Sequence, residues 1–127
     1  MTNGTATLYT TVGALNASNG SQVTVVAQGS QVSGVVDVWS SVVASGGSKV
    51  TWLSNATITT LILQTQAVFD KSLDARPMVV VNATIDGDSC QVLDPLSKMA
   101  WTNPIVVNGL VSNGPFVFLG TRSVKIT

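Results

Sequence analysis

The sequence predicts an all-β fold: a single antiparallel β-sandwich of jelly-roll type that spans residues 1–127 with eight or nine strands. Three observations support this prediction. Val and Thr dominate the chain, whereas Glu is absent and Lys and Arg together number six, so β-branched residues outnumber charged helix formers. Short runs alternate between apolar and polar residues. Turn-forming pairs separate these runs at intervals of about 12 residues.

In the N-terminal half, each predicted strand ends at a glycine or at another turn signal. The turns are expected at Gly13, Asn19-Gly20, Gly46-Gly47 and Ser54-Asn55, and a bulge is expected at Gly34. We predict strands at 5–12, 21–28, 31–44 and 49–53. Residues 57–69 also fit a helix, but their Thr, Ile and Val content favours a strand.

The C-terminal half begins with the most charge-dense segment, Asp70 to Pro77, which predicts an exposed loop. Residues 78–85 form a clear strand, and Asp86-Gly87 predicts a hairpin turn into the next one. Further strands are expected at 88–93, 100–107, 110–111, 116–119 and 122–127. We find no repeat with a period of 20 to 50 residues, and no linker.

The chain carries few charges. Only 9% of its residues are charged, six of each sign, and there is no His. Neutral proteins associate readily, and a surface without charges can be buried without the cost of desolvating ions. No side chain with an ordinary pKa titrates between pH 5 and 8, which suits an acidic or harsh exterior. This composition favours a subunit of an assembly.

Catalytic and cofactor chemistry find little support in these residues. A nucleophile needs a neighbouring base, and with neither His nor Glu we expect no enzymatic activity and no cofactor. Asp86, Asp88 and Asp94 could offer oxygen ligands to Ca²⁺, but turn chemistry explains them better. The single cysteine, Cys90, is expected to be a small buried residue rather than one half of an intermolecular disulfide.

Binding to nucleic acid or membrane is not expected either. The basic residues form no patch, no stretch is apolar enough for a transmembrane helix, and the first residues do not resemble a signal peptide. Trp39, Trp52 and Trp101 could stack on sugar rings, although a core or interface position is the commoner use of Trp. N-x-Ser/Thr sequons are unusually frequent, but several arise by chance in a chain rich in Asn and Thr, and without a signal peptide we do not expect N-glycosylation.

In composition and strand rhythm, the whole chain resembles a small single-jelly-roll capsid protein of an icosahedral virus, or a phage capsid decoration protein. The resemblance implies a virion subunit made in the host cytoplasm, with copies of itself and other virion proteins as partners. The alternatives are a carbohydrate- or receptor-binding sandwich of a virus fibre or tail, and an extracellular filament subunit that donates its terminal strand. The candidate interface residues are Trp52, Asp70, Lys71, Asp74, Arg76, Trp101, Arg122 and Lys125.

Overall fold

The structure, a computed structural model, describes residues 4–9, 13–26, 38–87, 89–107, 110–112, 117–119 and 122–126, with side chains up to Val107. All regular secondary structure in these ranges is β-strand. Their bounds are β1 (Thr5–Leu8), β2 (Ala14–Ala17), β3 (Gln22–Val25), β4 (Val38–Trp39), β5 (Ser41–Ala44), β6 (Lys49–Trp52), β7 (Thr57–Gln64), β8 (Val68–Asp70), β9 (Met78–Asp86), β10 (Gln91–Leu93), β11 (Met99–Trp101), β12 (Ile105–Val107), β13 (Leu110–Ser112), β14 (Val117–Leu119) and β15 (Arg122–Ile126).

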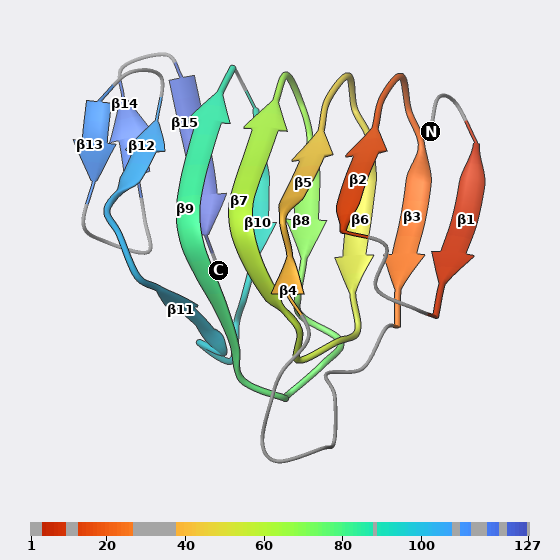
Figure 1. Ribbon diagram of the computed structural model, residues 1–127. Helices are drawn as coiled ribbons and strands as arrows, with labels where there is room; N and C mark the ends of the chain where they lie inside the picture. Colours follow the sequence, from red (N-terminus) through yellow and green to blue (C-terminus); the bar gives the residue numbers. More distant parts are fainter. Residues whose placement is uncertain are drawn as a thin grey trace.

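The chain winds as a flattened coil between two facing sheets (Figure 1). The first sheet has the strand order β1-β3-β6-β8-β10-β15-β14, and the second has the order β13-β12-β9-β7-β5-β2. Strands β4 and β11 extend the second sheet by pairing with β7 and β9. Each coil gives one strand to the first sheet and the next strand to the second, so neighbouring coils stack through parallel pairs such as β3 with β6 and β7 with β9. This architecture is a two-sheet β-solenoid.

The prediction of an antiparallel jelly-roll sandwich is therefore wrong, although the all-β class is right. Among the described strands only two pairs are antiparallel, β12 with β13 and β14 with β15, and both lie at one end of the stack. Half-buried strands show the same alternation of apolar and polar residues in either direction, so alternation carries no information about strand direction. A parallel pair needs a long connection between its two strands, and here that connection includes a strand of the opposite sheet.

The tight turns were predicted correctly as turns but not as hairpins. Asp86-Gly87 joins β9 in the second sheet to the β10 coil in the first, instead of returning to a neighbouring strand. Gly46 and Gly47 have φ of 62° and 76°, the left-handed conformation that favours glycine. Arches between sheets and hairpins both use this conformation, so the residue types alone do not separate them.

An internal repeat, which the sequence analysis did not detect, underlies the stack. Residues 17–25 read ASNGSQVTV and residues 44–52 read ASGGSKVTW, and the structure places Gln22 opposite Lys49 and Val23 opposite Val50. The interval is 27 residues here, as it is between the stacked Ser21 and Ser48. Later coils have other lengths, because Lys49 pairs with Val68 and Val68 with Gln91, and this variation hides the periodicity.

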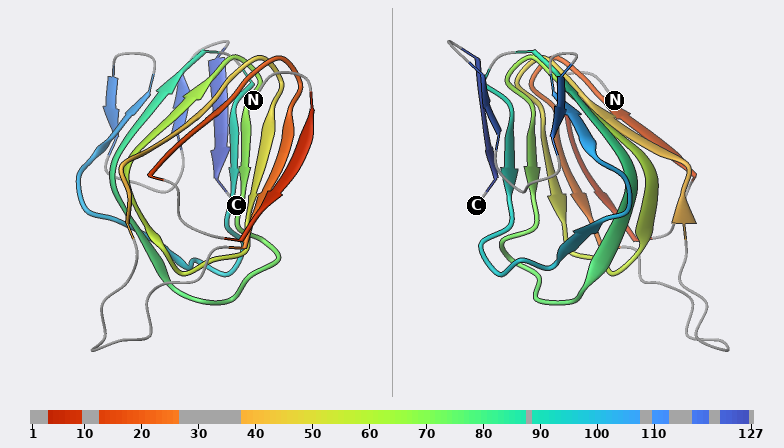
Figure 2. Two further views of the ribbon diagram at one scale, coloured as in Figure 1. Left: turned by 45° about the vertical axis from the view of Figure 1, so that its right-hand side comes forward. Right: turned by 90° about the vertical axis from the view of Figure 1, so that its left-hand side faces the viewer.

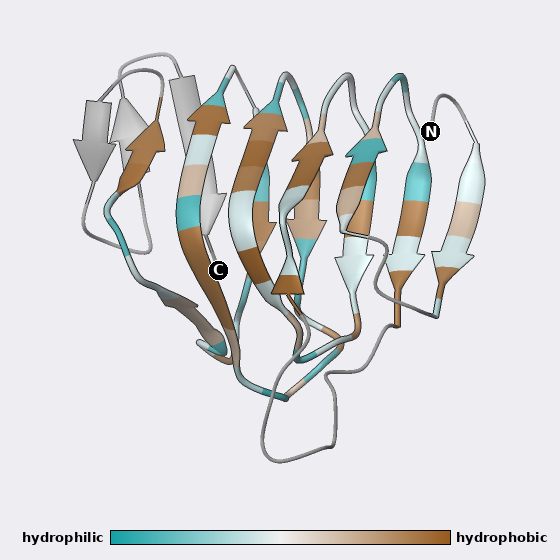
Figure 3. Cartoon of the chain, in the orientation of Figure 1, coloured by the Kyte–Doolittle hydropathy of each residue, from teal (hydrophilic) through white to brown (hydrophobic). Residues whose placement is uncertain are grey.

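The interior is wedge-shaped. The sheets lie close together at the edge with the tight turns and farther apart at the opposite edge (Figure 2). Beside the tight turns the first coils bury small residues such as Ala17 and Ala44, whereas the later coils bury Leu63 and Ile85 in the same row. At the wide edge Trp39 and Trp52 lie edge to face with ring centroids 5.6 Å apart, and Phe69 packs on Trp52 at the same distance. The alternation of apolar and polar residues along strands such as β3 is visible in Figure 3.

Several element boundaries also differ from the predictions. The structure adds β2, which we did not predict, and divides the expected strand at 57–69 into β7 and β8, separated by a turn at Thr65 and Gln66. The bulge predicted at Gly34 lies outside the described residues. No helix in the described ranges is long and apolar enough to cross a membrane.

Candidate functional site

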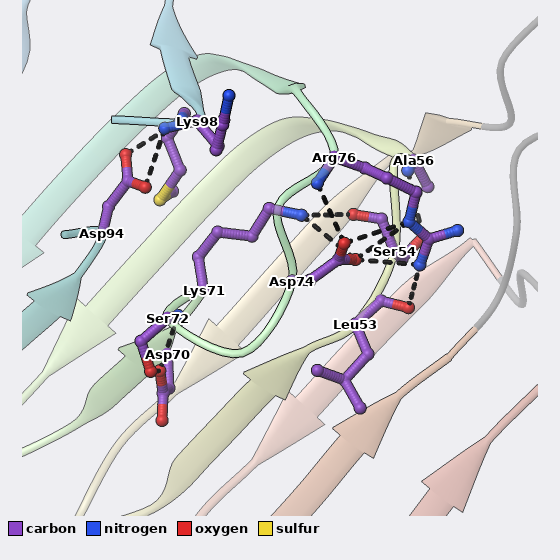
Figure 4. Close-up of polar contacts among 11 residues, drawn as sticks. Leu53, Ser54, Ala56, Asp70, Lys71, Ser72, Asp74, Arg76, Asp94 and Lys98 are labelled. Atoms are coloured by element: carbon purple, nitrogen blue, oxygen red, sulfur yellow. Dashed lines mark hydrogen bonds and ion pairs between the residues drawn. The ribbon is translucent and has the colours of Figure 1, made fainter. Parts of the chain in front are cut away.

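The buried charged groups gather at the wide edge, where three successive corners lie over one another. These corners comprise residues 53–56 between β6 and β7, 71–77 between β8 and β9, and 94–98 between β10 and β11. The middle corner contributes Lys71, Asp74 and Arg76, whose side chains converge in Figure 4. The large space between the sheets at this edge makes room for these long side chains.

Lys71 is the most unusual residue of this cluster, because its side chain is fully buried. Its ammonium donates to the Ser54 carbonyl oxygen at 2.8 Å and lies 3.3 Å from Asp74 Oδ2. Burial lowers the pKa of Lys71 below 10.5, and the attraction of Asp74 opposes this shift without cancelling it. A lysine stem can fill apolar space while its charge is held by fixed oxygens, and here it closes the base of the wedge.

Asp74 is the anion that holds the cluster together. Its carboxylate receives hydrogen bonds from Arg76 Nε at 3.0 Å and Nη2 at 2.8 Å, and from the Arg76 backbone N–H at 3.0 Å. Burial alone raises the pKa of Asp74, but the hydrogen bonds from Arg76 and the charge of Lys71 outweigh burial and lower the pKa from 3.8 to about 2. Arg76 Nη2 also donates to the Leu53 carbonyl oxygen at 2.8 Å, which ties this corner to the preceding one.

Two other carboxylates fix the ends of their strands. Asp70 accepts hydrogen bonds from the backbone and hydroxyl of Ser72, and it lies 3.4 Å from the Lys49 ammonium. Burial raises the pKa of Asp70, but these contacts outweigh it, and the pKa lies below its usual value. Asp94 accepts hydrogen bonds from the backbone N–H groups of Lys98 and Met99 at 2.8 and 2.9 Å. These contacts stabilise turns. Asp70, Asp74 and Asp94 are all buried, so none of the three carboxylates is directed at solvent.

A groove of about 360 Å³ runs across the same three corners on their outer side. Its lining residues are Asn55, Thr57, Pro77, Met78, Val79, Ser97, Lys98, Met99 and Ala100. The outer side chains of Thr57, Val79 and Ala100 lie on adjacent strands in one row, which gives the groove an apolar wall. The Lys98 side chain extends away from the Asp94 carboxylate (Figure 4).

The structure distributes the predicted interface residues differently from the sequence analysis. Trp52 is fully buried, so its ring lies in the core and does not face a partner or a sugar. The segment predicted as an exposed loop buries Asp70, Lys71 and Asp74 at the wide edge, and Arg76 stays half-exposed. Burial is possible because Lys71 pairs with Asp74 and Asp70 pairs with Lys49. Trp101 is half-buried. Arg122 and Lys125 belong to β15, where the structure describes the backbone only, and their role as contacts stays a prediction.

The acidic residues considered for Ca²⁺ do not come together. Asp86 ends β9 beside the tight turns, whereas Asp94 follows β10 at the wide edge, on the opposite side of the wedge. Asp88 lies outside the described residues. Within the described ranges no three His, Cys, Asp or Glu residues are grouped as metal ligands. Cys90 is buried beneath the turn, as predicted.

The chain matches no protein-family model, no curated protein and no solved structure.

Sequence reasoning missed the buried cluster for an identifiable reason. The spacing of Lys71, Asp74 and Arg76 is that of an exposed charged turn, and nothing in it shows that the side chains bond to the preceding corner at Leu53 and Ser54. The missing signal was the repeat. Alignment of residues 44–52 with 17–25 stacks β6 on β3, and β8 in turn pairs with β6. The charged segment directly after β8 then lies at a corner between the two sheets. The end of the stack at β1 and β2 was also missed, because neither stacked coils nor β2 itself were predicted.

Proposed function

We propose that this protein is a structural subunit of a virion, a capsid or capsid-decorating protein, that works by assembling with copies of itself and with other virion proteins. The observation that carries the proposal is the distribution of charge. No Asp, Glu, Lys or Arg precedes Asp37, so the segment that supplies β1, β2 and β3 has no charged side chain, and all twelve lie farther along the chain.

Among the described residues, this segment supplies the strands at one end of the stack. Strands β1 and β2 are the last strands of their sheets in the described structure, so each has a neighbour on one side only. In Figure 3 β1 shows no strongly hydrophilic residue. Natural edge strands that stay monomeric usually carry Lys, Pro or a bulge that blocks pairing, and the sequence of β1, Thr-Ala-Thr-Leu, has none of these. An uncharged end can be buried in an interface without the cost of removing water from ions, and this supports assembly through this end.

Light scattering coupled to size-exclusion chromatography, with electron microscopy of the same samples, tests the proposal. We expect a concentration-dependent increase in mass for the wild type. Thr5→Glu, which places a charge on the end strand, should reduce assembly. Gln91→Glu is the matched control, because Gln91 occupies the equivalent row on β10, an interior strand of the same sheet. A wild-type protein that stays monomeric at millimolar concentration refutes the proposal.

A further inference from the structure

The backbone of β1 is arranged so that its odd-numbered residues face the open side of the first sheet. Gln22 N donates to Gly4 O at 2.7 Å, and Val26 N donates to Leu8 O at 2.7 Å. In a parallel pair, alternate residues of a strand direct both their N–H and their C=O to the same neighbour. Gly4, Ala6 and Leu8 therefore bond to β3, and the backbone groups of Thr5 and Thr7 point away from it.

The next odd-numbered residue, Tyr9, continues this row and is 72% exposed. Tyrosine is among the residues enriched at the centres of protein interfaces, because it contributes a large contact area with little loss of side-chain entropy. This row of two Thr residues and one exposed Tyr carries no charge and lies next to backbone groups that no described strand pairs. These are the properties of an edge strand that can accept a partner strand.

We propose that β1 pairs with β1 of a second copy of this chain, antiparallel about a two-fold axis, so that the first sheet continues across the dimer. Thr7 faces Thr7 of the second copy at the axis, and Thr5 faces Tyr9 of the second copy on either side. All three are odd-numbered, so each facing pair exchanges two backbone hydrogen bonds. The inference rests on the proposed assembly function and names the contact through which it begins.

Charge favours this two-fold contact over a head-to-tail stack. In an isologous interface the same patch meets itself, so any net charge on the patch repels its copy, and a charge-free patch avoids that repulsion. A head-to-tail stack instead brings β1 to the opposite end, where the last strand, β14, pairs with β15, which carries Arg122 and Lys125. The segment before Asp37 has no carboxylate to pair with them. Cross-strand Thr–Thr and aromatic–Thr pairs are favourable neighbours in sheets.

Cysteine cross-linking tests the contact and its register. In a hydrogen-bonded antiparallel pair the Cα atoms lie about 5.5 Å apart, within the range that a disulfide spans. Thr7→Cys should therefore link two copies under mild oxidation. Thr5→Cys is the matched control: its counterparts in the dimer lie about 14 Å apart, so it should not link. The native Cys90 is buried and should leave the wild type unlinked.

A second pair of variants separates this contact from assembly in general. Thr7→Pro removes an N–H that β3 does not use and should weaken dimerisation at least tenfold with an unchanged circular dichroism spectrum. Thr7→Ala keeps the N–H and should stay within threefold of the wild type. If the wild type assembles but Thr7→Cys does not link and Thr7→Pro has no effect, this contact is refuted and the assembly function stands. A wild type that never assembles refutes both the β1 contact and the assembly function. In that case β1 would pair with another protein or another segment.

Discussion

At the residue scale, the buried lysine and its aspartate contribute unequally to the fold. Asp74 is the only carboxylate within ion-pair distance of Lys71 among the described residues, and it also anchors Arg76. Removal of one partner from a buried ion pair leaves the other charge uncompensated, which costs far more than the pair itself contributes. The two residues should therefore respond very differently to neutral substitutions.

We predict that Asp74→Asn destabilises the protein by about 3–5 kcal/mol, because it strands the Lys71 ammonium in the interior and weakens the Arg76 contacts. Lys71→Met keeps the apolar stem and removes the charge that burial disfavours, so its cost should stay below about 2 kcal/mol, mainly from loss of the hydrogen bond to the Ser54 carbonyl oxygen. Urea unfolding of the two variants measures both values. Equal losses would contradict the asymmetry.

Acid stability should follow the carboxylate of Asp74. Its pKa is about 2 in the folded protein and 3.8 without the fold, so the folded state holds the ionised form more strongly. The resulting stability is fully present above pH 4 and is lost as the pH falls through 2, by about 2 kcal/mol in total. The lowered pKa of Asp70 acts in the same direction.

Urea unfolding between pH 5 and pH 2 measures this dependence. The free energy of unfolding should stay flat down to about pH 4 and then decrease. The decrease should be smaller in Asp74→Asn, which lacks the titrating group. A wild-type decrease that begins near pH 6 would contradict the assignment, because the pKa values of Asp70 and Asp74 are both lowered.

At the element scale, the stacked turns set the closest approach between coils. A Cβ on Gly87 would lie 2.6 Å from the backbone N of Thr65 in the turn of the preceding coil, and Gly87 has a φ of 137°. At Gly47 a Cβ would have open space around it, and the residue has a φ of 76°. The two glycines thus separate strain within one turn from a clash between turns.

We predict that Gly47→Ala costs about 1–2 kcal/mol, the penalty of a left-handed conformation for a residue with a Cβ. Gly87→Ala should cost about 2–4 kcal/mol, because overpacking against Thr65 adds to the backbone strain. Thermal unfolding of both variants provides the comparison. A Gly87→Ala variant no less stable than Gly47→Ala would mean that the turns do not stack this closely.

The same elements show how far sequence reasoning reaches. Alternation and β-branched residues located strands such as 49–53 and 78–85 well, and glycine pairs located the turns. Strand direction was not predictable in this way, because Asn19-Gly20 can close a hairpin or cross from one sheet to the other. The 27-residue repeat was the decisive clue, and its unequal later coils concealed it. The buried position of Lys71 depends on neighbouring coils, so no local pattern could reveal it.

At the scale of the whole molecule, charge is absent from one end of the solenoid and present over the rest. All twelve charged residues lie from Asp37 onward, and the described ion pairs, which involve Lys49, Asp70, Lys71, Asp74 and Arg76, lie in the β6 to β9 region. An interface built on the first coil therefore lacks direct ionic contacts. Its strength comes from backbone hydrogen bonds and from the contact of Thr and Tyr side chains, and dissolved ions screen neither of these.

We therefore predict that the dissociation constant of the assembly changes less than threefold between about 50 and 500 mM NaCl, a range over which screening strengthens markedly. Sedimentation velocity at a series of concentrations measures it. An assembly that used Arg122 and Lys125 would instead weaken tenfold or more as salt screens these cations. Arg122→Gln provides the control, because loss of this charge should leave a first-coil interface unchanged. A marked salt dependence that disappears in Arg122→Gln would move the interface to the opposite end of the solenoid.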